Sequence, residues 1–515
     1  MQEVIVPYLI VAYIKYCVPR LQLFNEFNAL VNVKDLPKRC VLVHVYYRDP
    51  IFALIKSQVC QRMECLKTLC RCMQAVSPSN GLTGPPLLRA LNTMHKTTLG
   101  FTVAMISTHL YAGGFALNEQ GISGMGTAFA GRASAAEDAG TVYGNPAGMA
   151  RLAGQQVTGG ATFIDASTDI SQVSGRSSGS NDGDMVPFKA IPFGFYTRRL
   201  NEHWAIGLGA YVPFGLATDY ERGFQGRAFA SKSDAKVLTL QPTLSYAFND
   251  RVSVGFGPTI NQFAGSLESD LTLNPAIADS NVKVKGKDVA LGFNIGVLAS
   301  LTDTTQAGLT YHSKVRYDLD CHTEVATGAG TPAQLLSSNR YDCSLQVDTP
   351  ESYELSVTQK LTDAWTLYAG TTWTRWSRMK DLSFSTENIS PARGGILAAS
   401  LSGAIAGGLD WHDTWAYALG TSYRLDSHWS LRTGIRLDQS PTSNTNRSPR
   451  TPTGDRTIFS VGAGYDVSKE LTLDVAYAYL KEESVDVSRA NALASYSARY
   501  QNRASFLGVG ATYRF

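Results

Sequence analysis

The sequence predicts an all-β protein, a fourteen-stranded antiparallel transmembrane β-barrel with an N-terminal hatch in its lumen. Three observations carry this prediction. From about residue 155 onward, apolar side chains recur with a period of two rather than 3.6. The connections between these runs alternate between short and long. Finally, no run of eighteen or more apolar residues is present, so a membrane-spanning helix is not expected.

Residues 1–93 differ in composition from the rest of the chain. They carry 11 Lys and Arg against 5 Asp and Glu, and they hold six of the eight cysteines. These cysteines lack the matched Cys or His pairs of a zinc site. We interpret this part as a non-native upstream extension that results from an earlier start codon. The alternative is a genuine N-terminal module anchored by the apolar run at residues 4–14.

Residues 94–112 follow the pattern of a secretory signal peptide. Met94 is followed by the basic pair His95 and Lys96, then by a short apolar core and by Ala112 at a plausible cleavage position. Leu110 departs from the pattern, since a small residue is preferred two positions before the cleavage site. A short buried helix is the alternative. A signal peptide predicts export to an oxidising compartment.

Residues 113–152 are rich in Gly and Ala and contain Asn145-Pro146-Ala147. A fourteen-stranded barrel encloses a lumen wider than side chains can fill. We therefore predict that this segment packs inside the barrel as a hatch. A disordered periplasmic arm is the alternative.

The barrel itself is predicted for residues 153–515. In the run from Trp365 to Trp373, for example, Leu367, Ala369 and Thr371 share one face with the two tryptophans. Fourteen such runs are predicted, at about 155–168, 187–200, 203–215, 233–248, 251–270, 283–302, 305–321, 343–362, 365–379, 413–426, 429–440, 456–468, 471–484 and 503–515.

Short turns alternate with long connections between these runs. Turns such as Asn201-Glu202, Asn249-Asp250 and Asp426-Ser427 lie at one end, and longer connections such as 380–412 and 441–455 lie at the other. A membrane barrel produces this pattern, and it must close because unpaired backbone groups cost several kcal/mol each in hydrocarbon. A soluble β-sandwich or propeller is the alternative.

The chain ends in FLGVGATYRF, in which Leu507, Val509, Ala511, Tyr513 and Phe515 share one face. An alternating last strand with a terminal aromatic residue resembles the assembly signal of bacterial outer-membrane barrels. The predicted location is therefore the bacterial outer membrane.

The segment GGFALNEQGISGMGTAFAGRASAAEDAGTVYGNPAGM, residues 113–149, resembles the hatch of FadL-type transporters of long-chain fatty acids and aromatic hydrocarbons. Further matching stretches are VPFGLATDY (212–220), GLTYHSKVRYDL (308–319), WTRWSRMKDL (373–382), residues 417–441, and Pro452 with Asp455-Arg456. The resemblance covers about residues 113–515 and rests on the order and spacing of these motifs.

The resemblance implies a passive route for a hydrophobic ligand. Extracellular loops capture the ligand, an apolar pocket near the start of the hatch holds it, and a shift of the hatch opens a passage. The ligand then leaves sideways into the membrane through a gap at an inward kink of the third strand. This route keeps the alkyl chain out of water, which saves roughly 0.8 kcal/mol per methylene group.

The resemblance assigns roles to particular residues. Phe115, Leu117, Asn118, Glu119, Asn145, Pro146 and Ala147 are the expected hatch and gating residues. Pro213, Phe214 and Gly215 are the expected strand kink, since proline and glycine interrupt a ladder. The alternatives are that Asn145-Pro146-Ala147 only shapes a tight turn and that residues 212–215 are an ordinary strand end.

The acid group of the ligand is less well defined. Fatty-acid members of the family use basic residues in the lumen, but the stretch from Gly394 to Trp411, where a lysine is expected, has none. Arg227, Lys314 and Arg432 are candidates for carboxylate binding by charge alone. Both a long-chain fatty acid and an uncharged hydrocarbon therefore stay open as ligands.

The remaining expectations concern covalent links, partners and competing functions. Cys321 and Cys343 are expected to form a structural disulfide across one long loop. We expect a monomer in outer-membrane lipid and lipopolysaccharide, with no cofactor, no metal and no nucleic-acid partner. The alternative function is a general outer-membrane pore or adhesin. An enzyme is not expected, because the neighbours His312-Ser313 and His412-Asp413 would point to opposite faces of a strand.

Overall fold

A computed structural model describes residues 114–271, 277–332, 338–379, 383–386, 409–491 and 493–515. The predicted extension at 1–93, the predicted signal peptide at 94–112 and most of the apolar stretch 394–411 lie outside the described residues. Among the residues that are described, none belongs to a helix with both the length and the apolar character needed to span a membrane.

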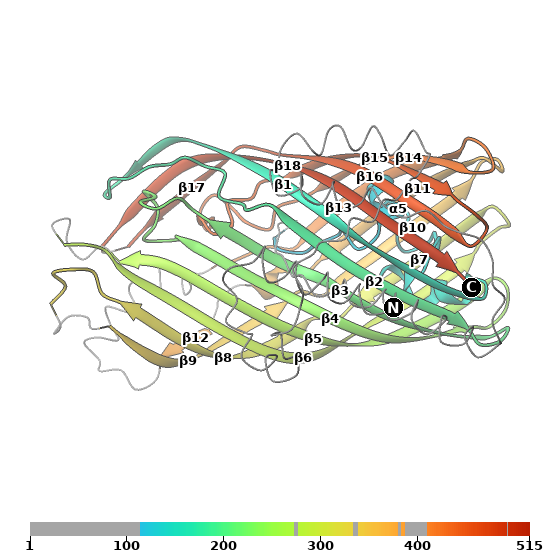
Figure 1. The fold of residues 1–515 in the computed structure, drawn as a ribbon, viewed down its shortest axis with the longest axis horizontal. Helices are drawn as coiled ribbons and strands as arrows, with labels where there is room; N and C mark the ends of the chain where they lie inside the picture. The colour runs from blue at the N-terminus through green and yellow to red at the C-terminus, as the bar shows by residue number, and fades with distance from the viewer. Residues whose placement is uncertain (1–113, 272–276, 333–337, 380–382, 387–408, 492) are drawn as a thin grey trace, which may run out of the picture. The chain divides into compact units, whose positions relative to one another are not determined.

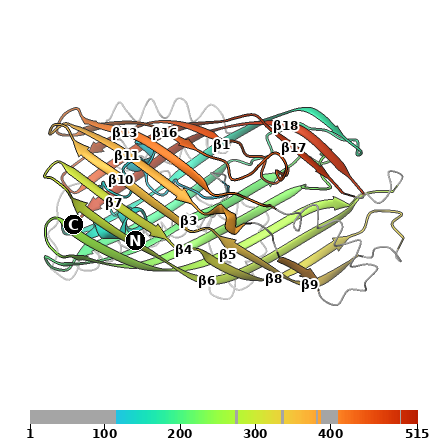
Figure 2. The same cartoon turned by 180° about the vertical axis from the view of Figure 1, so that it is seen from behind.

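Eighteen strand segments form one antiparallel sheet that closes on itself (Figures 1 and 2). They are β1 (Gln155–Gly175), β2 (Lys189–Arg199), β3 (Trp204–Asp219), β4 (Lys232–Ala247), β5 (Val252–Leu271), β6 (Ser280–Ser300), β7 (Thr305–His312), β8 (Val315–Ala326), β9 (Asn339–Thr349), β10 (Ser352–Lys360), β11 (Trp365–Thr374), β12 (Ser383–Thr386), β13 (Thr414–Arg424), β14 (Trp429–Asp438), β15 (Arg456–Asp466), β16 (Leu471–Glu482), β17 (Val485–Ala490) and β18 (Ser495–Arg514).

These segments make fourteen barrel strands, because four of the strands are interrupted. The segments β7 and β8 both pair with β6, and β16 and β17 both pair with β18. In the same way, β9 continues into β10, and β11 into β12. The first and last strands close the ring from Gln156↔Arg514 to Gly175↔Tyr496. The predicted fourteen-stranded antiparallel barrel is confirmed.

Most strands present an apolar outer face and a more polar inner face, whereas β8 and β9 bury apolar side chains and expose polar or charged ones. On β6, Leu291, Ile295 and Val297 are exposed, whereas the alternating Asn294 and Leu298 are buried. This alternation is what a barrel in lipid requires. Trp204, Trp365 and Trp429 each begin a strand directly after a short turn, which places a row of aromatic residues at that end, as in the aromatic girdles of membrane barrels.

The short turns share one local motif. The Oδ1 atom of Asn201 accepts hydrogen bonds from the backbone N–H groups of His203 and Trp204. Asn249 and Asp426 cap their own turns in the same way. Such side chains favour turns because they bond backbone a few residues ahead.

One long connection behaves differently from a surface loop. The connection between β14 and β15, residues 439–455, is largely buried, including Arg447, Arg450 and Thr453. Arg450 donates to the backbone oxygens of Lys232 and Glu268 on β4 and β5, while Asn502 on β18 donates to the oxygen of Pro452. This connection, called the strap below, therefore links two walls of the barrel that are far apart in strand order.

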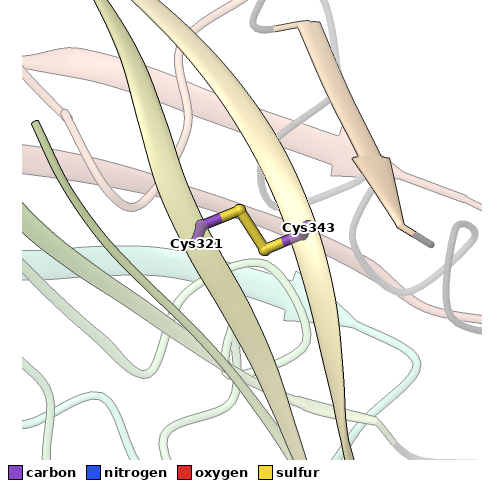
Figure 3. The surroundings of a disulfide bond; sticks show 2 residues. All are labelled: Cys321 and Cys343. Carbon is purple, nitrogen blue, oxygen red and sulfur yellow. A yellow bond between two sulfur atoms is a disulfide. The ribbon is translucent and has the colours of Figure 1, made fainter.

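Cys321 and Cys343 face each other in the register of β8 and β9 and form a disulfide with a Cα–Cα distance of 4.9 Å (Figure 3). The expected strand ends at these cysteines were wrong: β8 runs on to Ala326, and β9 begins at Asn339. Both cysteines are buried among apolar side chains such as Leu319 and Leu345. The disulfide therefore joins two paired strands at the inner face of the wall.

The N-terminal segment, residues 114–152, contains three short helices: α5 (Ile122–Gly126), α6 (Thr141–Gly144) and the 3₁₀ helix η3 (Pro146–Arg151). Each is far shorter than a helix that is stable by itself. Their stability must therefore come from contacts with the strands.

Candidate functional site

A belt of glycines on the strands receives the backbone of the N-terminal segment. A side chain at any of these glycines would collide with the segment, because backbone or side-chain atoms of residues 122–149 lie where a Cβ atom would stand. The belt consists of Gly207, Gly255, Gly296, Gly308, Gly370, Gly420, Gly434, Gly462, Gly508 and Gly510. Glycine permits this close approach between two backbones.

Polar side chains of the strands bind the carbonyl oxygens of the same segment. Thr310 donates to the oxygen of Gly144 (2.8 Å), Gln241 to that of Val142 (2.7 Å) and Ser253 to that of Ala147 (2.9 Å). These bonds give the three carbonyl oxygens the partners that buried backbone needs.

Asn145, Pro146 and Ala147 stand at the centre of these contacts. The Oδ1 atom of Asn145 accepts from the N–H of Ala147 (3.0 Å) and so caps η3. Its Nδ2 atom donates to the oxygen of Ala133 (2.6 Å) and to that of Val297 on β6 (3.0 Å). Asn145 therefore shapes a local turn and also ties the segment to the wall.

A buried ionic network lies beside the start of the segment. Arg132 pairs with Glu354 on β10 and donates to Oδ1 of Asn118 (3.1 Å). Glu119 is 5% exposed, and its Oε2 atom has no hydrogen-bond partner among the described residues. Burial raises the pKa of Glu119 to about 7, although the charges of Arg132 and Arg436 oppose this shift.

The wall opens between β2 and β3. Their pairing runs from Arg199↔Ala205 to Gly194↔Ala210 and stops there, while β3 continues along β4 to Asp219. In the register of β3 with β4, two residues, Val212 and Pro213, stand opposite Leu238 alone. The expected kink residues thus lie at a β-bulge, a feature that bends a strand.

The first residues of the N-terminal segment occupy the β3 edge that β2 has left. Ala116 pairs antiparallel with Phe214. Leu117 N donates to the oxygen of Pro213 (2.8 Å), and Gly215 N donates to that of Phe115 (2.9 Å). Residues 115–117 therefore act as a short substitute strand at the gap.

Phe115 joins this substitute strand to an aromatic cluster. Its ring centroid lies 5.4 Å from those of Phe214 and Trp376 and 6.1 Å from that of Trp411. All three partners come from other parts of the chain. Displacement of residues 115–117 from β3 would break up this cluster.

Phe115 and Trp411 also line a cavity of about 110 Å³, called the apolar cavity below. Most of its wall is apolar and comes from strands at the end of the long connections, for example Phe263, Leu319 and Val347. Arg450, from the strap, and Arg489, on β17, add two guanidinium groups. A site of this kind suits an amphiphilic molecule with one polar end.

A second cavity lies against the other side of the segment. It has a volume of about 380 Å³ and is lined by Glu137, by short-turn residues such as Asp303 and Asp363, and by Arg424 at the end of β13. Tyr368 donates to Glu137 (2.6 Å) at its edge. This polar cavity is a poor environment for an alkyl chain.

The three predicted carboxylate-binding residues lie apart from the apolar cavity. Arg227 pairs with Asp279 (2.6 Å), and Arg432 pairs with Asp474 (2.7 Å) and lines the polar cavity. Lys314 lies in the short break between β7 and β8. The basic residues that line the apolar cavity, Arg450 and Arg489, were missed, because the sequence alone does not show which arginines the fold brings to this cavity.

Comparison with known proteins agrees with this architecture. Residues 103–515 match the model of the family described as "Outer membrane protein transport protein (OMPP1/FadL/TodX)". The chain belongs to this family. It is therefore an outer membrane transport protein, as the predicted resemblance and location implied.

Individual relatives match over most of their length. A long-chain fatty acid transport protein of Escherichia coli O6:H1 is 28% identical over 453 residues, which cover 82% of this chain and 98% of the relative. Outer membrane protein P1 of Haemophilus influenzae is 28% identical and is covered to 95% by 78% of this chain. The crystal structure of a Pseudomonas aeruginosa FadL homologue superposes with a TM-score of 0.70 at 24% identity, covering 78% of this chain and all of that one.

Members with other ligands share the fold as well. The CymD monoaromatic hydrocarbon channel superposes with a TM-score of 0.57 at 19% identity, covering 78% of this chain and 99% of that one. At such identities the similarity concerns the fold. The choice of ligand must come from the residues of this chain.

Proposed function

We propose that this protein is a channel for passive uptake of long-chain fatty acids across the outer membrane, with a hatch formed by residues 113–152. The ligand is captured at the end of the long connections and enters the apolar cavity beside Phe115. It leaves sideways through the gap between β2 and β3. The observation that carries this proposal is the substitute strand, residues 115–117, on the free edge of β3.

The fit of the segment to the glycine belt supports a hatch rather than a periplasmic arm. The belt brings strands from β3 to β18 into contact with residues 122–149. Because contacts this close leave little room for water, the segment would block free diffusion of ions. A general pore, the alternative function, would need this segment to be elsewhere.

The distribution of polarity supports a lateral exit. An alkyl chain that continued toward the short turns would enter the polar cavity beside Glu137. Its transfer from an apolar to an aqueous environment costs roughly 0.8 kcal/mol for each methylene group. Movement through the gap at β3 leads instead to the lipid that faces the outer surface of the barrel.

Two features favour a fatty acid over an uncharged hydrocarbon as the ligand. Arg489 brings a guanidinium group to a mostly apolar cavity, and arginine is well suited to carboxylates. Several relatives that match over most of their length, including that of Escherichia coli, are named for long-chain fatty acid transport. We propose that the barrel works as a monomer surrounded by outer-membrane lipid and lipopolysaccharide.

A reversible crosslink tests the lateral gate directly. Ala116→Cys combined with Phe214→Cys joins the substitute strand to β3, because these residues face each other. In cells that lack their own importers, oxidation should abolish uptake of a radiolabelled long-chain fatty acid, and reduction should restore it. A matched control pair, Ala369→Cys with Leu419→Cys, crosslinks two neighbouring wall strands away from the gap.

Equal uptake by the oxidised and reduced gate variants would overturn the gating proposal. Uptake of toluene without uptake of fatty acid would move the assignment to a hydrocarbon importer. A correctly inserted barrel that takes up neither compound but conducts ions would support the general pore instead, and one that does neither would support an adhesin.

A further inference from the structure

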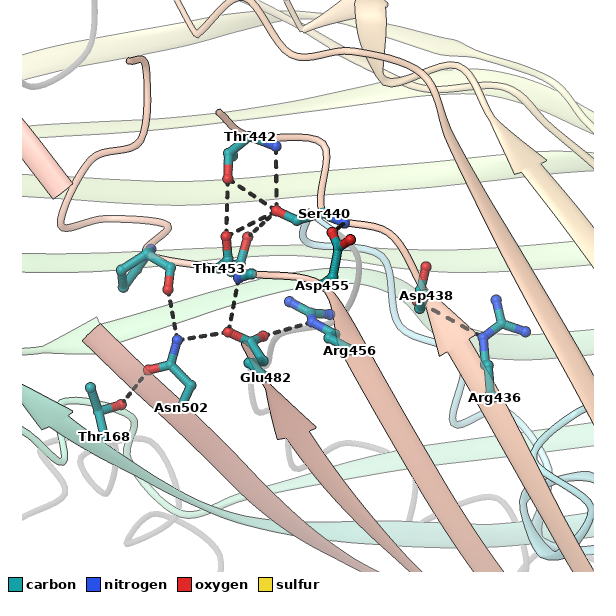
Figure 4. Close-up of polar contacts among 12 residues, drawn as sticks. Thr168, Arg436, Asp438, Ser440, Thr442, Thr453, Asp455, Arg456, Glu482 and Asn502 are labelled. Carbon is teal, nitrogen blue, oxygen red and sulfur yellow. Dashed lines mark hydrogen bonds and ion pairs between the residues drawn. The ribbon is translucent and has the colours of Figure 1, made fainter. Parts of the chain in front are cut away.

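Arg456 has two donor groups that no residue described by the structure accepts. The residue begins β15, points to the inner face of the wall and is 3% exposed. Its Nε atom donates to Oε1 of Glu482 on β16 (2.6 Å; Figure 4). The Nη1 and Nη2 atoms are buried and have no hydrogen-bond partner among the described residues.

The carboxylate of Glu482 makes no hydrogen bond to these two atoms and is held by other donors. Its Oε2 atom accepts from Nδ2 of Asn502 (2.7 Å) and from the N–H of Gly454 (3.2 Å; Figure 4). Asn502 is itself fixed by bonds to Thr168 and to the oxygen of Pro452. A buried donor without a partner is costly, so the guanidinium group is prepared for an acceptor from outside the chain.

A cavity of about 40 Å³ adjoins Arg456. Most of its other lining residues are apolar, among them Ile164, Val186, Leu480 and Phe506. This space exceeds that of a single water molecule and admits a group the size of a carboxylate. A forked guanidinium donor beside apolar walls matches the head and first methylene groups of a long-chain acid.

The strap connects this cavity, called the Arg456 cavity, with the apolar cavity. Ser448, Arg450 and Thr451 of the strap line the apolar cavity, and the next residues, Pro452 and Thr453, line the Arg456 cavity. The two cavities therefore lie on either side of one stretch of backbone.

The Arg456 cavity also adjoins the apolar packing that leads to the gap. Ile164 and Phe506 belong to a buried cluster that includes Ile191 and Phe193 on β2 and Val212 at the bulge of β3. Apolar side chains therefore extend from this cavity to the edge of the proposed exit.

We propose that the Arg456 cavity is a second binding site for the ligand's carboxylate, which the ligand reaches from the apolar cavity past the strap before it leaves at β3. The inference rests on the proposed function, since it assumes a fatty-acid ligand. Arg456 acts there as the anchor of the head group. The alkyl chain lies toward the apolar cluster.

Binding stoichiometry tests the existence of the second site. The purified full chain in detergent, titrated with radiolabelled stearate, should bind two molecules per barrel. Ala504→Leu fills the Arg456 cavity and should reduce this number to one, and Ala235→Leu, the matched variant in the apolar cavity, should do the same for the other site. One bound molecule in the wild type, with no effect of Ala504→Leu, would overturn the proposal.

A comparison of stearate with stearyl alcohol tests the role of Arg456. Arg456→Gln combined with Glu482→Gln removes both charges and avoids an unpaired buried carboxylate. At equilibrium in detergent the ligand can also enter the Arg456 cavity through the gap at β3, so this site stays accessible in the Ala235→Leu background. In that background, the double change should weaken stearate binding about 10-fold or more, because a hydrogen bond to a charged group is lost, and it should leave the alcohol unaffected. Arg499→Gln is the control, since Arg499 on β18 pairs with Asp486 and is not among the residues that line this cavity.

The Ala235→Leu variant that keeps Arg456 and Glu482 should bind stearate more tightly than stearyl alcohol. Equal affinity for the two compounds would overturn the role of Arg456. That result would leave the proposed function intact, because uptake and binding in the apolar cavity would persist. Failure of the proposed function would instead show as the absence of stearate binding at both sites and of uptake in cells.

Discussion

The apolar cavity and the polar cavity lie against the same N-terminal segment, but they differ in size and in lining. The apolar cavity measures about 110 Å³ and is walled by side chains such as Phe115 and Leu319. The polar cavity measures about 380 Å³ and is lined by charged residues such as Glu137 and Arg432. The larger space is thus the one less suited to a hydrophobic ligand.

This difference shows that the volume of a cavity does not identify the path of a hydrophobic ligand through the barrel. Water can fill the polar cavity and reach the charged side chains, whereas an alkyl chain gains free energy only where apolar surface is removed from water. The segment separates the two environments. Changes on its apolar side should therefore alter ligand handling, and changes on its polar side should not.

The largest effect is expected for Phe115→Ala. Truncation of a buried phenylalanine typically costs about 3–5 kcal/mol, and here it also removes the ring that packs against Phe214, Trp376 and Trp411. Titration with a fluorescent fatty acid should show affinity at least about 10-fold weaker. Phe163→Ala, where the ring stacks on the exposed Phe188, is the control. Unchanged affinity would place the ligand elsewhere.

Gly308→Val should displace the N-terminal segment and so remove the separation between the apolar and the polar cavity. A Cβ atom at Gly308 would overlap the carbonyl oxygen of Ala133, and such overpacking costs about 1–3 kcal/mol. The barrel should still insert, but ion conductance in a planar bilayer should rise because the segment no longer seats. Gly194→Val is the matched control, since nothing lies within 4 Å of a Cβ there. Equal conductance of both variants would contradict the hatch.

The seating of the segment should weaken as pH rises through about 7. The pKa of Glu119 is raised by burial, so its neutral form stabilises the seated segment below pH 7, and this contribution is lost as the carboxyl ionises. Maleimide labelling of Ala116→Cys should therefore rise severalfold from pH 6 to pH 8 beyond the rise seen with Glu119→Gln also present. The second variant corrects for the reactivity of the thiol, and identical pH profiles would refute the role of Glu119.

The smallest effect is expected on the polar side. Lys360→Glu reverses a charge that lines the polar cavity. Fatty-acid uptake should change by less than about twofold, since surface-accessible charges contribute little. A larger loss of uptake would mean that the ligand passes through this cavity, and the contrast between the two sides would then fail.

The barrel could be predicted closely because its signals are local. Alternation with a period of two and turn-forming residues such as Asn201 and Asp426 act within a few residues of each other. The extent of the last strand was less clear, since β18 begins at Ser495 with residues that bury Tyr496 and Tyr500 and turn polar side chains such as Arg499 outward, the reverse of a lipid-facing strand. The burial of the strap was not predicted, because its length resembles that of a surface loop.

The site could be predicted only in part. Proline and glycine at 213–215 indicated an irregular strand, and the bulge lies there. Ala116, which pairs with Phe214 beside this bulge, is far away in sequence, and no local pattern indicates such a pairing. The arginines show the same limit. Arg227 and Arg432 have acidic partners that only the fold brings near. Arg456 pairs with Glu482 in the same way, but two of its donors meet no acceptor among the described residues.

The pairing of β1 with β18 has a consequence for biogenesis. Its partners, such as Gln156 and Arg514, lie at opposite ends of the barrel sequence, so this seam is of very high contact order and is expected to form late. Until then the growing sheet has two open edges that lipid cannot satisfy, and an assembly factor must shield them. The N-terminal segment precedes β1. We expect it to enter the lumen while the sheet curls, before the pairing of β1 with β18 closes the barrel.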